Sequence, residues 1–192
     1  MSAALVVLSG GQDSTTALFW AKHRFETVHT ITFNYGQRHI REIDAACTIA
    51  GMAGVASHEV VPIGPILGGG SPLTDHGAKL EQYPDYATMD NVIGARVELT
   101  FVPLRNALFL ILAANRAVVL GTQDIVTGVC QADNANYPDC RQVFINATME
   151  MLDQALGPTL PPITIHTPLM NKTKAESIKL ALSLPGCYYA LA

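Results

Sequence analysis

Apolar and polar residues follow one another along the chain in blocks that predict alternating strands and helices. Short apolar or alternating runs, which are typical of strands, occupy residues 3–8, 27–33, 57–61, 124–129 and 163–166. Longer stretches with apolar residues three and four positions apart, which indicate helices, occupy residues 13–23, 40–52, 105–120, 141–156 and 172–184. This succession predicts an α/β fold: a doubly wound, Rossmann-like parallel sheet of five strands with helices on both faces.

Residues 62–100 break this pattern. They contain three consecutive glycines, at 68–70, and four prolines, which interrupt both kinds of periodicity. A connection of this length inside a compact domain is usually functional. We therefore expect residues 1–192 to form a single domain that carries a long loop or flap at 62–100.

Three clusters of polar residues follow predicted strands, at 9–14, 34–39 and 130–141. Parallel strands end at the same edge of a sheet, and ligands of a doubly wound sheet bind beyond that edge. The three clusters should therefore meet. The pattern predicts one active site at the carboxyl ends of the strands.

Composition narrows the class of protein. Hydrophobic residues make up 49% of the chain and charged residues 15%, which suits a packed core. The net charge of −4 argues against a nucleic-acid partner, because such proteins usually present a basic face. No apolar run approaches the roughly 18 residues of a membrane span, and the first residues lack the basic stretch of a signal peptide. The four cysteines form no C-x-x-C pair, so we expect a reduced, cytoplasmic protein without membrane contact.

The first polar cluster lies in the stretch LSGGQDSTT, residues 8–16. Gly10 and Gly11 allow backbone N–H groups to turn toward an anion, and the positive end of the following helix points to the same place. The stretch lacks the Lys of a Walker A loop, and Asp13 suits a phosphate only if a divalent cation such as Mg²⁺ lies between them. The alternative is an ordinary strand-to-helix turn that Asp13 or Ser14 caps. On the first interpretation, the phosphate-binding residues are Leu8, Ser9, Gly10, Gly11, Gln12, Asp13, Ser14, Thr15 and Thr16.

Cations and one amide fall near the same edge. Arg38 follows the second predicted strand and either neutralises a bound anion or is a solvated loop charge. Arg105 opens a helix, where the helix dipole disfavours a cation, and this local cost suggests that it faces a bound anion. Its neighbour Asn106 either reads the edge of a purine or caps the backbone. Lys172 and Lys174 begin the last predicted helix. Either one of them reaches phosphate, with Lys174 as the candidate, or both are solvated at a helix start that Thr173 partly caps.

The loop 130–141 offers groups that suit a planar, guanine-like base. Tyr137 has a stacking face, and the carboxylate of Asp139 accepts paired hydrogen bonds. Arg141 suits a carboxylate or a phosphate, and Asp133 lies in the same loop. The alternative is a type I turn with Pro138 at its second position. Both interpretations are compatible.

The stretch S-G-G-Q-D-S resembles the signature of the N-type ATP pyrophosphatases, the PP-loop superfamily with a HUP-type fold. Together with four further motifs it resembles the 7-cyano-7-deazaguanine synthase (QueC) family of queuosine biosynthesis. The resemblance runs from about residue 3 to about residue 180 and rests on LSGGQDSTT (8–16), TFNYGQRH (32–39), FVPLRN (101–106), GVCQADNANYPDCR (128–141) and TPLMNKTKAE (167–176).

This resemblance implies an ATP- and Mg²⁺-dependent ligase. ATP adenylates the carboxylate of 7-carboxy-7-deazaguanine, ammonia displaces AMP to give an amide, and a second activation dehydrates the amide to the nitrile preQ0. On this basis Asp13, Arg105 and Arg141 are the expected catalytic residues, and Arg38 and Lys174 join the loop in holding ATP. The substrate-binding residues would be Asn106, Asp133, Tyr137, Asp139 and Arg141. A homodimer is also expected, because members of the family tend to dimerise.

Two departures from the family pattern stand out. Family members carry a C-terminal zinc site of four cysteines, whereas here Cys187 comes too early and lacks the companions that such a site needs. We therefore expect these 192 residues to be part of a longer chain. The family usually has Gly at the position of Leu104, where Leu would be strained if φ is positive.

Rival interpretations stay open at this stage. One is a related ATP-dependent ligase that modifies tRNA. Another is a degenerate PP-loop nucleotide-binding module without synthase activity. The sequence also leaves open whether a 7-deazaguanine product serves the modification of tRNA or of DNA.

Overall fold

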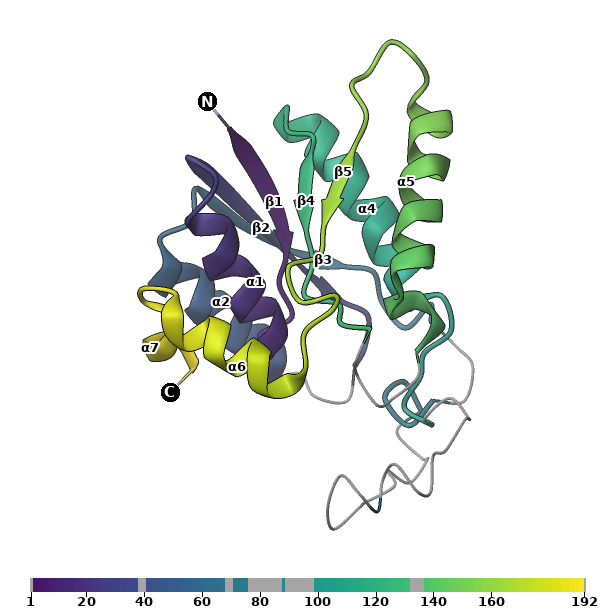
Figure 1. Ribbon diagram of the computed structural model, residues 1–192. Helices are drawn as coiled ribbons and strands as arrows, with labels where there is room; N and C mark the ends of the chain where they lie inside the picture. The colour runs from purple at the N-terminus through teal and green to yellow at the C-terminus, as the bar shows by residue number, and fades with distance from the viewer. Residues whose placement is uncertain are drawn as a thin grey trace.

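The computed structural model describes residues 2–37, 41–67, 71–75, 88, 99–131 and 137–191. Within these residues one sheet of five parallel strands has the order β3-β2-β1-β4-β5 (Figure 1). The strands are β1 (Ala3–Val7), β2 (Thr27–Asn34), β3 (Ser57–Pro62), β4 (Asp124–Val126) and β5 (Thr164–His166). The helices are α1 (Gln12–Lys22), α2 (Arg41–Ala53), α4 (Arg105–Leu120), α5 (Gln142–Leu156), α6 (Lys174–Ser183) and α7 (Cys187–Leu191), with a 3₁₀ turn η1 (Pro138–Cys140). The doubly wound fold predicted from the sequence is confirmed.

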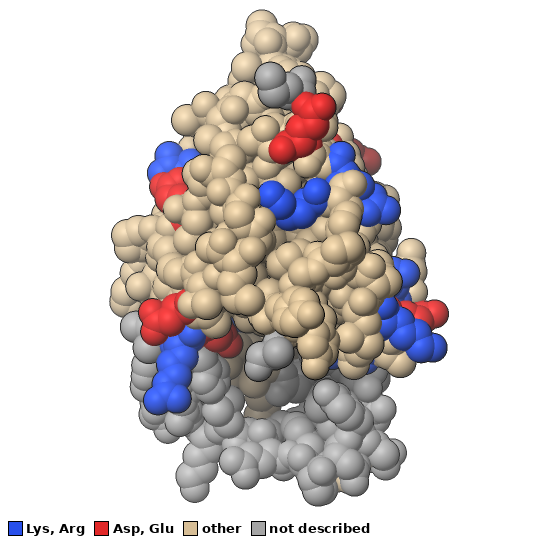
Figure 2. All heavy atoms as spheres, turned by 90° about the vertical axis from the view of Figure 1, so that its left-hand side faces the viewer, with Lys and Arg blue, Asp and Glu red and all other residues tan. Residues whose placement is uncertain are grey.

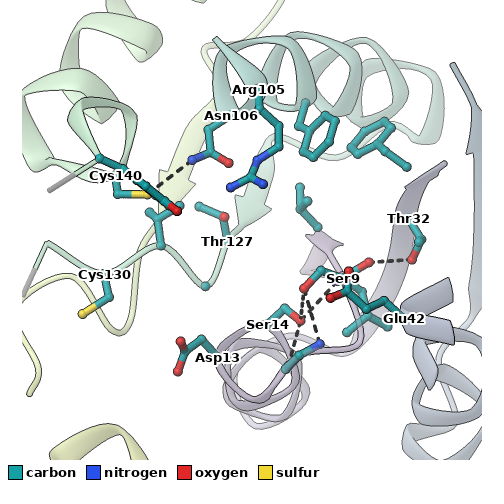
Figure 3. A pocket seen from close by; sticks show the side chains of 18 of the residues that line it. Ser9, Asp13, Ser14, Thr32, Glu42, Arg105, Asn106, Thr127, Cys130 and Cys140 are labelled. Carbon is teal, nitrogen blue, oxygen red and sulfur yellow. Dashed lines mark hydrogen bonds between the residues drawn. The ribbon is translucent and has the colours of Figure 1, made fainter. Parts of the chain in front are cut away.

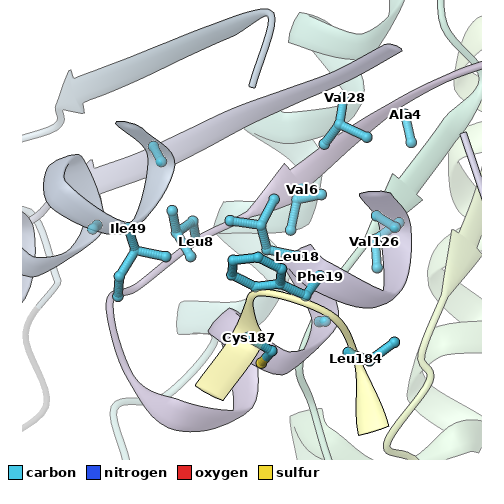
Figure 4. Close-up of a cluster of buried hydrophobic side chains, with 14 of the residues drawn as sticks. Ala4, Val6, Leu8, Leu18, Phe19, Val28, Ile49, Val126, Leu184 and Cys187 are labelled. Atoms are coloured by element: carbon cyan, nitrogen blue, oxygen red, sulfur yellow. The ribbon is translucent and has the colours of Figure 1, made fainter. Parts of the chain in front are cut away.

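The central strand β1 distributes its side chains between two hydrophobic clusters, because successive residues of a strand point to opposite faces. Ala4 and Val6, with Leu8 just after the strand, pack with α1, α2, α6 and α7 on one face, and Figure 4 shows this cluster. Leu5 packs on the other face, against α4 and α5. Both faces are therefore covered by helices, which explains why β1 is apolar at successive positions.

The start of α1 differs from the sequence prediction. The helix begins at Gln12 after Gly11, and no side chain caps it. Ser14 Oγ instead accepts a hydrogen bond from Ser9 N at 3.1 Å and donates one to Gly11 O at 3.0 Å. The prediction that Asp13 or Ser14 caps α1 was wrong, because Gly11 supplies the extended backbone of the cap and Ser14 binds the preceding loop.

The last predicted helix starts two residues later than expected. Thr173 is the N-cap of α6, and it forms a capping box with Glu176. Glu176 Oε2 accepts a hydrogen bond from Thr173 N at 2.8 Å, while Thr173 Oγ1 accepts one from Glu176 N at 3.3 Å. Lys172 therefore precedes the helix, and Lys174 is its first residue.

The short helix α7 was not predicted. Its first residue, Cys187, is fully buried in the cluster on the α1 face (Figure 4), where burial raises the pKa of the thiol. Gly186 lets the chain enter α7 with a φ of +83°, and a Cβ there would lie 3.0 Å from the Phe19 ring. Cys187 thus packs the core, which is a poor environment for a thiolate metal ligand.

The predicted loop at 62–100 lies mostly outside the described residues. Pro62 ends β3 and Thr88 is helical, against the prediction for these two positions, whereas the described segments 63–67, 71–75 and 99–100 carry no strand or helix, in line with it. Ser71 Oγ donates a hydrogen bond to Thr100 O at 3.0 Å and so joins two parts of this segment.

The face formed by α1, α2, α6 and α7 carries few charges, which lie scattered over a largely uncharged surface (Figure 2). Several exposed apolar side chains belong to α6 and α7, namely Ile178, Leu182, Tyr188, Tyr189 and Leu191. Among the described helices, none is both long and apolar enough to span a membrane.

Candidate active site

A cavity of about 370 Å³ opens at the carboxyl ends of β1, β2 and β4. Its lining includes residues 8–14, apart from Gly10, from the loop after β1, Tyr35 and Gln37 after β2, and residues 127–130 after β4. The start of α4 and the turn η1 complete the wall (Figure 3). The convergence of strand-following residues that the sequence predicts is therefore observed, and the volume suits a small-molecule site.

The loop after β1 forms one side of this cavity and is tightly folded on itself. Ser9 Oγ and Ser14 Oγ lie 3.0 Å apart, and Thr15 Oγ1 donates a hydrogen bond to Gly11 O at 2.9 Å. The backbone N–H groups of the first helical turn have no partners within the helix. They and the positive end of the α1 dipole suit an anion, as predicted for a phosphate loop.

Two glycines make this arrangement sterically feasible. Gly10 has a φ of +85°, and a Cβ at this position would lie 2.4 Å from Glu42 O. Gly128, at the end of β4, approaches α1 so closely that a Cβ would lie 2.7 Å from both Asp13 C and Ser14 N. The loop after β1 is thus held between α2 and the residues that follow β4, at positions where only a hydrogen atom fits.

Asp13 and Lys174 form an ion pair at the edge of the cavity. Lys174 Nζ lies 3.0 Å from Asp13 Oδ2 and 3.2 Å from Asp13 Oδ1, although 161 positions separate the two residues. Two of the residues predicted to act on phosphate are therefore brought together. At this point the carboxylate of Asp13 can change its partner from Lys174 to a metal ion, and Lys174 can change its partner from Asp13 to a phosphate. Neither charge is then left unpaired.

Arg105 is the first residue of α4, as the sequence predicts, and its side chain points into the cavity (Figure 3). Its guanidinium makes no hydrogen bond or ion pair with another of the described residues. The preceding residue, Leu104, has φ 63° and ψ 11°, the left-handed conformation that the family pattern suggested for this position. Leu104 is the sole described residue other than glycine with positive φ.

The 137–141 segment behaves partly as predicted. Cys140 N donates a hydrogen bond to Tyr137 O at 3.2 Å, which is the expected turn, and Tyr137 lines the cavity. The Tyr137 ring centroid lies 5.4 Å from that of Phe101, and its hydroxyl is hydrogen-bonded to Thr100 Oγ1. Tyr137 therefore contacts residues that lead into α4 as well as the cavity.

Asp139 and Arg141 lie away from the cavity lining. Asp139 is 6% exposed, and its Oδ2 accepts a hydrogen bond from Asn106 N at 3.1 Å. Asn106 Nδ2 donates to Asp139 O at 3.3 Å, so Asn106 binds the backbone of the turn, the second of the two roles considered for it. Arg141 is exposed and precedes α5 as its N-cap. The structure therefore favours a supporting role for Asp139 over direct contact with a ligand.

Two predicted site residues, Arg38 and Asp133, lie outside the described residues. Sequence reasoning missed Glu42, Thr127 and Gly128, which all line the cavity. Glu42 lies in the first turn of α2, which begins at the same sheet edge, so the rule applied to α1 would also have indicated it. Among the described residues no three His, Cys, Asp or Glu side chains form a group suited to a metal.

Comparison with known proteins assigns the family. A family model described as queuosine biosynthesis protein QueC matches residues 3–191. The chain belongs to the QueC family. A 7-cyano-7-deazaguanine synthase of Gloeobacter violaceus is 50% identical over 97% of this chain and 77% of its own length, and one of Laribacter hongkongensis is 46% identical over 98% and 78%.

The solved structures extend the relationship at the level of the fold. A 4-thiouridine synthetase, solved with RNA and ATP, superposes with a TM-score of 0.54 at 16% identity, over 99% of this chain and 42% of that protein. At this identity the likeness concerns the fold alone. The QueC relatives named above are enzymes of 7-deazaguanine synthesis, as the resemblance in the sequence implied.

Proposed function

We propose that this protein uses ATP to convert 7-carboxy-7-deazaguanine and ammonia to 7-cyano-7-deazaguanine. The observation that carries the proposal is the cavity itself. A glycine-rich loop at a helix N-terminus, Asp13, Lys174 and Arg105 surround one space at the sheet edge. Membership of the QueC family supports the choice of substrate.

In the proposed reaction the substrate carboxylate attacks the α-phosphate of ATP, and pyrophosphate leaves with the electron pair of the broken bond. Ammonia then adds to the acyl carbon and AMP departs, which gives the amide. A second ATP activates the amide oxygen with release of pyrophosphate, and loss of AMP and of both protons of the amide nitrogen yields the nitrile. The loop 9–14 would hold the departing pyrophosphate, where backbone N–H groups and the α1 dipole stabilise negative charge.

Asp13 and Lys174 would change partners when the nucleotide binds. Mg²⁺ is usually held by one or two carboxylates and by substrate phosphates, so Asp13 suits it without a larger ligand group. The ion would supply charge neutralisation for the phosphates. Lys174, released from Asp13, would then bind a phosphate oxygen. For zinc the described residues offer no suitable ligand set, and no step depends on it.

Arg105 would neutralise the substrate carboxylate or the α-phosphate as charge develops there, because its guanidinium points into the cavity. Tyr137, which also lines the cavity, would contact the planar base. Arg38 and Asp133 stay candidates for phosphate and base binding, and Arg141 for the substrate carboxylate.

The test is mass spectrometry of a reaction that contains the protein, Mg-ATP, ammonium and 7-carboxy-7-deazaguanine. We expect the nitrile, with AMP and pyrophosphate. Arg105→Ala should lower the rate by about 100-fold, since one preorganised charge is removed from the transition state. Arg116→Ala is the matched control, because Arg116 lies in the same helix but pairs with Glu59 on the surface at 2.7 Å. Equal losses in the two variants would contradict the assignment.

A nucleotide-binding module without synthase activity is the second candidate. The strained Leu104 at the entrance to α4 favours it, because the family usually has Gly there. ATP binding without release of pyrophosphate would identify this function.

Cytoplasmic location and a homodimer are also part of the proposal. A biosynthetic reaction that consumes ATP supports the first. The exposed apolar side chains of α6 and α7 support the second, and sedimentation equilibrium at several concentrations would test it.

A further inference from the structure

We infer that Asp139 is a positioning residue, which fixes the direction in which Arg105 enters the cavity. The inference rests on the proposed function of Arg105 as the group that meets a bound anion. Asp139 itself does not line the cavity, so it would act through the start of α4.

The first step is the contact between Asp139 and the N-terminus of α4. Asp139 Oδ2 accepts a hydrogen bond from the backbone N–H of Asn106 at 3.1 Å. This N–H belongs to the first turn of the helix and has no partner within it. Asp139 therefore caps α4 from outside, from a turn more than 30 positions further along the chain.

The second step is the number of bonds that join the same two segments. Asn106 Nδ2 donates to Asp139 O and to Cys140 Sγ, both at 3.3 Å (Figure 3 shows the second). Thr100, which lies four positions before Leu104, is hydrogen-bonded to the Tyr137 hydroxyl. Hydrogen bonds thus join the turn at 137–140 to the chain both before Arg105, at Thr100, and after it, at Asn106.

The third step concerns the charge of Asp139. A buried carboxylate is costly unless its oxygens are hydrogen-bonded, and Asp139 Oδ1 has no hydrogen-bond partner among the described residues. A neutral cap would avoid this cost. The negative charge has one evident effect: it offsets the positive end of the α4 dipole, which otherwise disfavours a cation at Arg105.

The fourth step is the mobility that Arg105 would otherwise have. Arginine has several rotatable bonds, and no described residue binds the guanidinium of Arg105. The described residues therefore hold the backbone of Arg105, which sets where its side chain enters the cavity. Leu104 fixes that backbone on one side through its left-handed conformation, and Asn106, held by Asp139, fixes it on the other.

The experiment is a double-mutant cycle between Asp139 and Arg105. Binding of Mg-ATP alone and of 7-carboxy-7-deazaguanine alone is measured by calorimetry, and kcat and KM are measured in the full reaction. Arg105→Ala identifies which ligand the guanidinium meets. Asp139→Ala should weaken the binding of that same ligand, or lower kcat, by about 10- to 100-fold, because small displacements of a reacting group have effects of this size. In the Arg105→Ala background the same change should have less than about a 2-fold effect.

Two variants separate positioning from folding. Asp139→Asn keeps the shape and an acceptor for Asn106 N–H but removes the charge, so it should lie between wild type and Asp139→Ala. Asp153→Asn, on the exposed surface of α5, should change nothing. Chemical denaturation of every variant gives the folded fraction, by which the rates are corrected.

Two outcomes would overturn the inference. One is that the effects of Asp139→Ala and Arg105→Ala multiply in the double variant. The other is that Asp139→Ala lowers stability while binding and kcat per folded molecule stay unchanged. If wild type binds both ligands but makes no nitrile, the proposed function fails. The inference about Asp139 is then tested by the binding affinities of the four proteins of the cycle alone.

Discussion

Replacement of Leu104 by glycine should stabilise the protein. Leu104 adopts φ 63°, where a Cβ is too close to the following carbonyl oxygen. The side chain is 70% exposed, so it loses little contact with water on folding. In the partly compact unfolded chain a leucine side chain is about as accessible to water as Leu104 is in the folded protein. Removal of the Leu104 side chain therefore loses almost no net hydrophobic stabilisation.

The magnitude follows from two opposing effects. Relief of the left-handed strain contributes about 1–2 kcal/mol, while the greater freedom of glycine in the unfolded chain costs about 0.4–1 kcal/mol. The net gain is about 0.8 kcal/mol, and for a chain of this size it raises Tm by about 2–3 °C. The backbone of α4 should keep its direction, because glycine adopts the same φ without strain.

The assay is thermal and urea unfolding of three variants beside wild type. Leu104→Gly should be more stable, whereas Leu104→Ala should stay close to wild type because it keeps the Cβ. Leu182→Gly, in α6, is the matched control: its side chain is 60% exposed, and glycine in a helix costs about 1 kcal/mol. If Leu104→Gly were destabilised as much as Leu182→Gly, the strain argument would be refuted.

Two further predictions concern glycine packing and helix capping. Gly128→Ala should cost about 1–3 kcal/mol and weaken Mg-ATP binding in calorimetry, since its Cβ would lie 2.7 Å from Ser14 N, whereas Gly51→Ala, with open space around it, should be neutral or stabilising. Thr173→Ala should cost about 1 kcal/mol in urea unfolding through loss of the capping box. Hydrogen bonds from the backbone N–H and then from the hydroxyl of Thr173 lower the pKa of Glu176 below 4.5, so their stabilisation is present above that pH and is lost as pH falls through the folded value. Thr173→Ala keeps the backbone bond and loses the hydroxyl bond, so its stability should depend somewhat less on pH below about 4.5, and a steeper acid profile would contradict this account.

The sheet and most helix boundaries could be predicted because they depend on periodicity. The helix 105–120 was predicted with its observed bounds, since sixteen residues of regular apolar spacing leave little ambiguity. The convergence of loops at one edge followed from parallel topology alone. The short elements η1 and α7 contain too few residues to show a period, and β4 is shorter than its apolar run because the last residues of that run line the cavity instead.

The candidate site was predicted by residue type more successfully than by orientation. Asp13, Lys174 and Arg105 lie around the cavity because each is near the end of a strand or the start of a helix at that edge. Asp139 occurs in an equally polar stretch, and nothing local distinguishes a carboxylate that faces a ligand from one that caps a neighbouring helix. That distinction depends on how η1 packs against α4, which is a long-range contact.

The backbone at the cavity shows how specific side-chain functions depend on positions that carry no chemistry. Gly10 and Gly128 lack a Cβ at two close approaches of the backbone, where an added Cβ would overlap neighbouring backbone atoms. Leu104 keeps a Cβ where the backbone disfavours one, and it does so one residue before Arg105. Packing offers no compensation, because the side chain is exposed. The strain is therefore borne by the bonds that hold the start of α4, and Asp139 makes the strongest of these, since a hydrogen bond to a carboxylate is stronger than one to a neutral acceptor. On this argument the loss of Asp139 should be less harmful in a Leu104→Gly background than in wild type, because less strain then opposes the same helix start.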